Sequence, residues 1–148
     1  MTTVPFETTL RVRDTCLCMH VQRAARALAR RFDSALRPVG LTSGQFSLLM
    51  SLNRPAPPTM AEVAALLALD RTTLTAALKP LVRRGLAEVR PDASDARLRR
   101  PALTDEGRAL IARALPLWEA EHARIDRSFG DAGADRLRAD LRWMSHGD

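Results

Sequence analysis

The sequence contains no tyrosine, only two cysteines and three histidines, so few residues are available for disulfides or metal binding. Cys16 and Cys18 lie two apart in a helical pattern, where their side chains diverge by about 200° and do not easily close into a disulfide. Cys16 and His20 share a helical face, but two ligands do not make a zinc site, and neither His122 nor His146 has a matching spacing. We expect no disulfide framework, no metal and no cofactor.

The sequence also lacks the signatures of membrane proteins, secreted proteins and common enzymes. No apolar run approaches the roughly 20 residues of a membrane span, and the first residues lack the apolar segment of a secretory signal. A cytoplasmic location is therefore the expectation. The Gly-x-Ser-x-Gly, His-Glu-x-x-His and phosphate-loop motifs are absent as well. We expect no catalytic residues and a protein that is not an enzyme.

Arginine supplies nearly all of the positive charge, because Lys79 is the only lysine and the net charge is +6 over 148 residues. A chain of this length with 46% hydrophobic residues fits one domain that buries its own core. Excess positive charge is compatible with an anionic partner, but a composition rich in arginine and alanine can also reflect the genome. The placement of the arginines therefore decides what the charge means.

The first long pattern runs from Arg11 to Val39, with apolar residues at alternating spacings of three and four. It predicts one long amphipathic helix that ends where Pro38 and Gly40 break the pattern. A single small domain seldom needs a helix of this length, so we expect part of it to pack against a second subunit. The opposite face is basic and is typical of a solvated surface. It carries Arg23, Arg26, Arg30 and Arg31.

Three short helices are predicted next, each with a recognisable start. Thr42 and Thr59 are each followed three residues later by Gln or Glu, which is the spacing of a capping box. Asp70 is the predicted N-cap of the third helix, which ends at Gly85. Only a tight turn separates the second and third helices. This is the helix-turn-helix arrangement, in which the second helix enters the major groove of DNA.

The two faces of that third helix differ in character. At 100° per residue, Leu74, Leu78 and Leu81 gather on one side together with Val82, whereas the other side is polar and cationic. Threonine can bond base edges or phosphates, and lysine and arginine can contact phosphates or guanine. The predicted DNA-contacting residues of this helix are Arg71, Thr72, Thr73, Thr75, Ala76, Lys79 and Arg83. The alternative is an ordinary solvent-exposed helix face.

Pro80 lies within the same helix. It removes one backbone hydrogen bond, so we expect a kink or a break between Ala76 and Pro80.

Two short strands, Ala87 to Pro91 and Arg99 to Leu103, are predicted around a turn-rich segment. A hairpin directly after a recognition helix is the wing of a winged helix. Arginines gather here, and a wing can place arginine in the minor groove. Arg97 and Arg99 complete the predicted DNA-contacting set. The alternative is a solvated hairpin with internal pairs between aspartate and arginine.

A second long helix is predicted after the hairpin. Thr104 is its predicted N-cap and Pro116 is expected to bend it, and a final short helix contains Leu137, Leu141 and Met144. The sequence thus divides into an N-terminal dimerisation helix (1–40), a winged helix-turn-helix (41–104) and C-terminal dimerisation helices (105–148) within one integrated domain. The predicted fold is mostly α with a small β-hairpin wing.

Several short motifs, taken in order, resemble the MarR family of transcriptional regulators. They are Gly40-Leu41-Thr42 with Gln45-Phe46, then Asp70 with Thr72-Thr73-Leu74, then Arg84-Gly85-Leu86, and then Asp92, Asp95, Ala96 and Arg97. In the wing motif of the family a basic residue is common where this chain has Ser94. The resemblance implies a homodimer that binds a pseudo-palindromic operator in double-stranded DNA. It also implies a repressor that a small aromatic or lipophilic effector releases.

Two alternative functions stay open. Cys18 is similar in position to the reactive cysteine of the branch that senses organic hydroperoxides, which makes it a candidate redox residue. That branch uses tyrosines near the thiol, whereas Phe32 and Ser43 occupy the approximate counterparts here, so a plain apolar cysteine is the competing interpretation. The second alternative is a non-catalytic basic helical module that binds RNA or an acidic protein.

Overall fold

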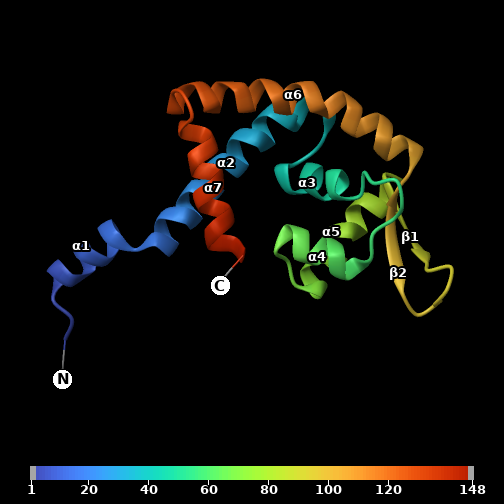
Figure 1. The fold of residues 1–148 in the computed structure, drawn as a ribbon, viewed down its shortest axis with the longest axis horizontal. Coiled ribbons are helices and arrows are strands. Elements are labelled where there is room, and N and C mark those ends of the chain that lie inside the picture. Colours follow the sequence, from blue (N-terminus) through green and yellow to red (C-terminus); the bar gives the residue numbers. More distant parts are fainter. Residues whose placement is uncertain (1–2, 147–148) are drawn as a thin grey trace.

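In the part of the chain that the structure describes, helices make up nearly all of the secondary structure, and a single hairpin interrupts them (Figure 1). The computed structural model describes residues 3–146. Its elements are α1 (Phe6–Thr15), α2 (Leu17–Leu36), the 3-10 turn η1 (Arg37–Val39), α3 (Ser43–Ser51), α4 (Met60–Leu67), α5 (Arg71–Arg83), β1 (Ala87–Pro91), β2 (Arg99–Leu103), α6 (Asp105–Phe129) and α7 (Gly133–His146). The expected fold class is confirmed. Within the described range, no helix is long and apolar enough to cross a bilayer.

The predicted helix starts are present with the expected chemistry. The Thr42 hydroxyl accepts from the Gln45 amide at 3.2 Å, and the Gln45 side chain accepts from the Thr42 amide at 3.1 Å. An equivalent capping box begins α4 at Thr59. At the start of α5, a carboxylate oxygen of Asp70 accepts from the Thr73 amide at 2.7 Å, and this bond holds the pKa of Asp70 below its usual value.

The first long helix is not continuous, contrary to the expectation from the sequence. Cys16 is extended, with ψ at 108°, and separates α1 from α2. No residue of α1 is buried, so packing does not oppose the break, and Thr15 and Cys16 are both weak helix formers. The Thr15 hydroxyl instead donates to the Arg11 carbonyl at 2.7 Å. Cys16 and Cys18 therefore do not lie in one continuous helix, and the expected divergence of their side chains assumed that they do.

The expected break at Pro80 does not occur. Helix α5 runs without interruption from Arg71 to Arg83, although Pro80 donates no backbone hydrogen bond. Leu74, Leu78 and Leu81 are buried on its inner face, with at most 3% exposed. Burial of three leucines outweighs the loss of one hydrogen bond, so packing keeps the helix intact.

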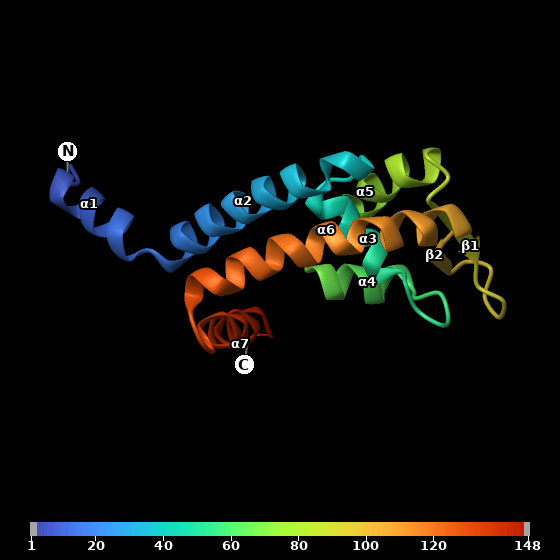
Figure 2. The same cartoon turned by 90° about the horizontal axis from the view of Figure 1, so that it is seen from above.

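The core lies where the end of α2 meets the winged helix-turn-helix and the first half of α6. Helix α6 runs alongside α2, passes over α3 and contacts β2 at its start (Figures 1 and 2). The fully buried leucine and valine side chains of this core are Leu36, Leu49, Val63, Leu74 and Leu81. One apolar cluster therefore fixes α5 relative to the long helices.

An ion pair links α2 to α6 beside this core. Arg31 Nε donates to Glu121 Oε1 at 2.6 Å, and Arg124 Nη1 reaches the other oxygen at 3.0 Å. Only 8% of the Glu121 side chain is exposed. The hydrogen bond from Arg31 lowers the pKa of Glu121, so this carboxylate is charged at neutral pH and its contribution to stability is lost as the pH falls through the lowered pKa.

The start of α6 is fixed against the turn that ends α5. The Thr104 hydroxyl accepts from the Gly107 amide at 3.0 Å and donates to the Gly85 carbonyl at 2.6 Å. The Thr104 amide donates to the Leu86 carbonyl at 3.2 Å. Gly107 lies so close to this turn that an added Cβ would be 2.0 Å from the Leu86 carbonyl oxygen. The absence of a side chain at Gly107 permits the contact.

Both ends of the chain leave apolar side chains uncovered. Helix α1 stands away from the rest of the molecule (Figure 1), and α7 has no buried residue. The large exposed apolar residues of the terminal helices include Phe6, Val12, Leu17, Val21, Leu28, Leu137, Leu141, Trp143 and Met144. Val21 and Leu28 belong to the apolar side of the predicted dimerisation helix. The division into dimerisation helices and a winged core stays an interpretation.

We expect Gly107→Ala to lower the free energy of unfolding by about 1–3 kcal/mol, because the new methyl group would displace the Leu86 backbone. Gly44→Ala is the matched control. It places the same methyl in a helix where no atom lies within 4 Å, so we expect unchanged or slightly increased stability. Chemical denaturation of both variants measures the difference, and equal stabilities would contradict the close contact at Gly107.

Candidate nucleic-acid interface

The outer face of α5 is exposed and has the polar, cationic character predicted from the sequence. Every predicted contact residue of this helix is exposed, whereas three of the four apolar residues assigned to the inner face are buried. The exposed set is Arg71, Thr72, Thr73, Thr75, Ala76, Lys79 and Arg83. The fourth apolar residue, Val82, is 40% exposed and lies at the edge of this face.

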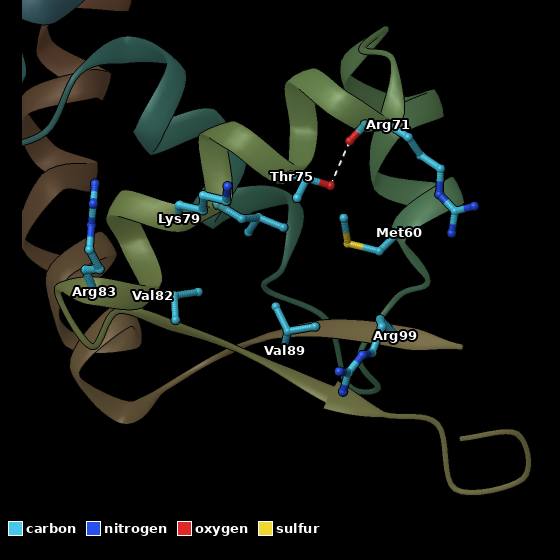
Figure 3. Close-up of a pocket in the computed structure, with 9 residues that line it drawn as sticks. Met60, Arg71, Thr75, Lys79, Val82, Arg83, Val89 and Arg99 are labelled. Atoms are coloured by element: carbon cyan, nitrogen blue, oxygen red, sulfur yellow. Dashed lines mark hydrogen bonds between the residues drawn. The ribbon is translucent and has the colours of Figure 1, made fainter. Parts of the chain in front are cut away.

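The threonines of this face have different hydrogen-bonding states. The Thr73 hydroxyl donates to the Asp70 carboxylate at 2.9 Å and so belongs to the helix cap. The Thr75 hydroxyl donates to the Arg71 carbonyl at 2.8 Å (Figure 3). Because its proton is engaged, the Thr75 oxygen is left as an acceptor and its methyl stays available for apolar contact.

A cavity of about 510 Å³ lies between α5 and the hairpin (Figure 3). Four of its lining residues are apolar: Met60, Leu78, Val82 and Val89. Four others are cationic: Arg71, Lys79, Arg83 and Arg99. The sequence did not predict this cavity. The position of Val82 between the inner and outer faces of α5 could have indicated an apolar surface there. The contribution of Val89 could not have been predicted without the register of the hairpin.

The hairpin forms with the predicted strands. β1 and β2 are antiparallel, with Val89 opposite Pro101 and Arg90 opposite Arg100. Arg97 lies beyond the strands, and 92% of its side chain is exposed. Its Nε is 3.3 Å from Asp95 Oδ1. An exposed pair of this kind contributes little to stability, so the Arg97 guanidinium is free to contact an external anion.

Arg100 has a different environment from the other wing arginines. Its Nη1 donates to the Pro57 carbonyl at 2.9 Å, and its Nε donates to the Asp92 carboxylate. The side chain is 31% exposed, whereas only 9% of the Asp92 side chain is exposed. Arg100 therefore joins the loop end of the hairpin to the segment between α3 and α4 and sets the position of the wing.

Asp92 organises the wing tip from the same place. One of its oxygens accepts from the Ser94 hydroxyl at 2.6 Å and from the amides of Ser94 and Asp95 at 3.0 and 3.1 Å. The Ser94 hydroxyl and then Arg100 hold the pKa of Asp92 far below its usual value. The carboxylate is thus ionised throughout the neutral range. Ser94, which stands where the family often has a basic residue, acts here as a turn residue.

The cysteines lie far along the chain from this surface. Cys18 is exposed, and the Gln22 amide donates to its sulfur at 3.2 Å. Cys16 is partly buried at the break between α1 and α2. Both thiols are free in the structure. The redox role of Cys18 stays a prediction.

Comparisons with solved structures agree with a winged helix that reads DNA. The transcriptional regulator MosR of Mycobacterium tuberculosis, solved in complex with DNA, is 42% identical, with 88% of this chain and 93% of that chain covered and a TM-score of 0.80. CouR of Rhodococcus jostii, solved with p-coumaroyl-CoA, is 25% identical, covers 91% and 95%, and has a TM-score of 0.79.

A third similar structure is BpsR of Bordetella bronchiseptica, whose DNA binding is regulated by 6-hydroxynicotinic acid. It is 26% identical, covers 90% and 96% of the two chains, and has a TM-score of 0.78. A search of curated protein sequences finds no match.

The fold and the exposed face of α5 define a DNA-binding regulator of the winged-helix class. The family model of MarR regulators matches residues 39–98, which contain the helix-turn-helix, β1 and the loop that follows it. With the similarity to MosR along most of the chain, this shows that the protein belongs to the MarR family of transcriptional regulators. Members of this family are regulators rather than enzymes in general.

We expect Arg100→Gln to release the wing without unfolding the domain, because the variant loses the charged bond to Asp92 and weakens the bond to the Pro57 carbonyl. Hydrogen exchange of the amides from Asp92 to Leu98 should be at least about fivefold faster, while exchange in α3 stays unchanged. Arg90→Gln is the control, since Arg90 lies opposite Arg100 but, among residues 3–146, its side chain pairs only with Glu88. Equal wing exchange in both variants would refute the role of Arg100.

Proposed function

We propose that the protein is a homodimeric repressor that binds a pseudo-palindromic operator through α5 and the wing. The observation that carries this proposal is the exposed polar and cationic face of α5, together with the exposed Arg97 of the wing. Phosphate contacts by arginine would position the dimer, and Thr72, Thr75 and Lys79 would read base edges in the major groove. The uncovered apolar residues of α1, α2 and α7 support a second copy as the partner.

The proposed activity is binding without catalysis. A regulator of this kind works in the compartment that holds the chromosome, so we propose a cytoplasmic location. Arg99 belongs to β2 and lines the cavity beside α5, as Arg71 and Arg83 do. We assign it to the phosphate contacts together with Arg71 and Arg83.

We expect Thr75→Ala and Arg97→Ala to weaken operator binding in different ways. Loss of Thr75 should cost about 1–3 kcal/mol on the best duplex and reduce discrimination between sequences. Loss of Arg97 should weaken binding to all duplexes. It should also make the slope of log K against log salt shallower by the contribution of about one phosphate contact per wing. Selecting duplexes from a random pool with the wild type, followed by anisotropy titrations at several salt concentrations, measures both effects.

Thr9→Ala and Arg113→Ala are the controls, since both residues are exposed on helices outside the winged core. They should bind like the wild type. The assigned surface is wrong if Thr75→Ala and Arg97→Ala also retain full affinity and selectivity for the selected duplex.

We propose further that the cavity between α5 and the hairpin holds the effector. Its volume lies within the range of small-molecule sites, and apolar walls with cationic side chains at the edge suit an aromatic carboxylate. Arg71, Lys79 and Arg83 line the cavity and also belong to the proposed DNA-contacting face. A bound anion would therefore compete with DNA phosphate for the same cations, which provides a direct route to release.

Val89→Phe should narrow this cavity and raise the concentration of 4-hydroxybenzoate needed for half-maximal release at least about tenfold. Operator affinity without the ligand should change less than about threefold, since Val89 is an apolar strand residue outside the predicted contacts. Val4→Phe is the control for the added ring, because Val4 is 72% exposed near the N-terminus. Release that is equally sensitive in wild type and Val89→Phe would place the effector elsewhere.

A further inference from the structure

A stripe of three arginines runs along α2 without any acidic partner. Arg23, Arg26 and Arg30 are all exposed, and within residues 3–146 no carboxylate lies within 4 Å of their guanidinium groups to form an ion pair. Their neighbour Arg31 differs, because it pairs with Glu121 on α6. We call Arg23, Arg26 and Arg30 the α2 stripe. Three cations on one exposed helix face repel each other, so the stripe favours a polyanionic partner.

The stripe is hollowed rather than flat. A depression of about 610 Å³ is lined by its three arginines together with His20, Ala24 and Ala27. The alanines are short, so the long arginine side chains stand at the sides of an open surface. This arrangement allows a chain of phosphates to approach the helix closely while several guanidinium groups contact it.

The orientation of α2 sets the direction in which the stripe faces. Phe32 and Leu36 are buried on the opposite side of α2, where this helix packs against α6 and α3. The stripe lies about 120–180° around the helix from Phe32 and therefore faces away from α6. Figure 2 shows α2 and α5 on the same side of α6. The stripe and the recognition helix thus share one side of the molecule.

The position of α2 along that side is also informative. In Figure 1 the wing lies on one side of α5, and the N-terminal half of α2 lies on the other. In a dimer on DNA, two recognition helices lie about 34 Å apart, one helical turn of the duplex. If the wings contact the outer flanks, the stripes of both protomers face the segment between the recognition helices. From Arg23 to Arg30 the helix rises by about 10 Å, a length that matches about three phosphates of one strand.

We infer that the α2 stripe is a second phosphate-binding surface, which contacts the DNA backbone between the two recognition helices of the dimer. This inference rests on the proposed function. Because phosphates carry no sequence information, the stripe would add affinity and salt dependence without changing the preferred operator. In this arrangement α5 contacts the base edges, and the α2 stripe contacts the phosphates at the centre of the operator.

The test replaces Arg23, Arg26 and Arg30 together by Gln in the full chain. Binding is titrated at several salt concentrations, both on the duplex selected by the wild type and on a scrambled duplex of equal length. We expect the slope of log K against log salt to become shallower by at least about 2, since each lost phosphate contact removes about 0.9. Affinity should fall at least about tenfold on both duplexes, and the ratio between them should stay within about twofold.

The matched control replaces Arg113, Arg127 and Arg142 by Gln, which removes the same charge from exposed positions on α6 and α7 that form no ion pair in the described chain. Its slope should change by less than about 1. A third variant with Lys at Arg23, Arg26 and Arg30 keeps the charge and should retain most of the wild-type slope. Thermal melting and light scattering of each variant verify that it folds and keeps the mass of the wild type.

Three results would overturn the inference while the proposed function stands. They are a Gln variant with the same slope as its control, a Lys variant as weak as the Gln variant, and a Gln variant whose mass shows loss of the dimer. The last would place the stripe at a subunit contact. Failure of the proposed function is recognised separately, because the wild type itself would then select no sequence from the random pool.

Discussion

The close approach of α6 to the turn after α5 is the contact on which the functional surface depends. Thr104 bonds the turn through both its amide and its hydroxyl, and Gly107 permits the two backbones to meet. That turn ends the recognition helix and begins β1, so one contact fixes the helix, the hairpin and the long helix in a single arrangement. Any movement of α6 is therefore transmitted to the exposed face of α5, which we propose contacts DNA.

Local chemistry made much of this arrangement predictable from the sequence. The capping boxes at Thr42 and Thr59 and the N-cap at Asp70 depend on residues three apart, so the sequence contains the whole interaction. The strand bounds followed from turn residues in the same way. The break at Cys16 was not predicted, because it depends on the lack of packing around α1. The spacing of apolar residues in a helix does not show whether another element covers them.

Contacts between distant residues were the part that the sequence did not reveal. Arg100 bonds the Pro57 carbonyl 43 residues away, and no local pattern around either residue predicts that contact. Pro80 indicated a break that the burial of Leu74, Leu78 and Leu81 prevents. The cavity beside α5 likewise requires the register of the hairpin to bring Val89 opposite the helix. In each case tertiary packing decided the outcome over local preference.

The arginines of this protein have different roles, which depend on the groups that they contact. Arg31 is paired with a nearly buried carboxylate and stabilises the joint between two long helices, whereas Arg100 positions the wing through Asp92. Arg97 and the α2 stripe retain exposed guanidinium groups. Net charge alone does not distinguish these roles, because all contribute equally to it. The partners do distinguish them, because an arginine that the fold leaves without a buried acid can pair with an external anion, and such arginines make up the proposed DNA-binding surface.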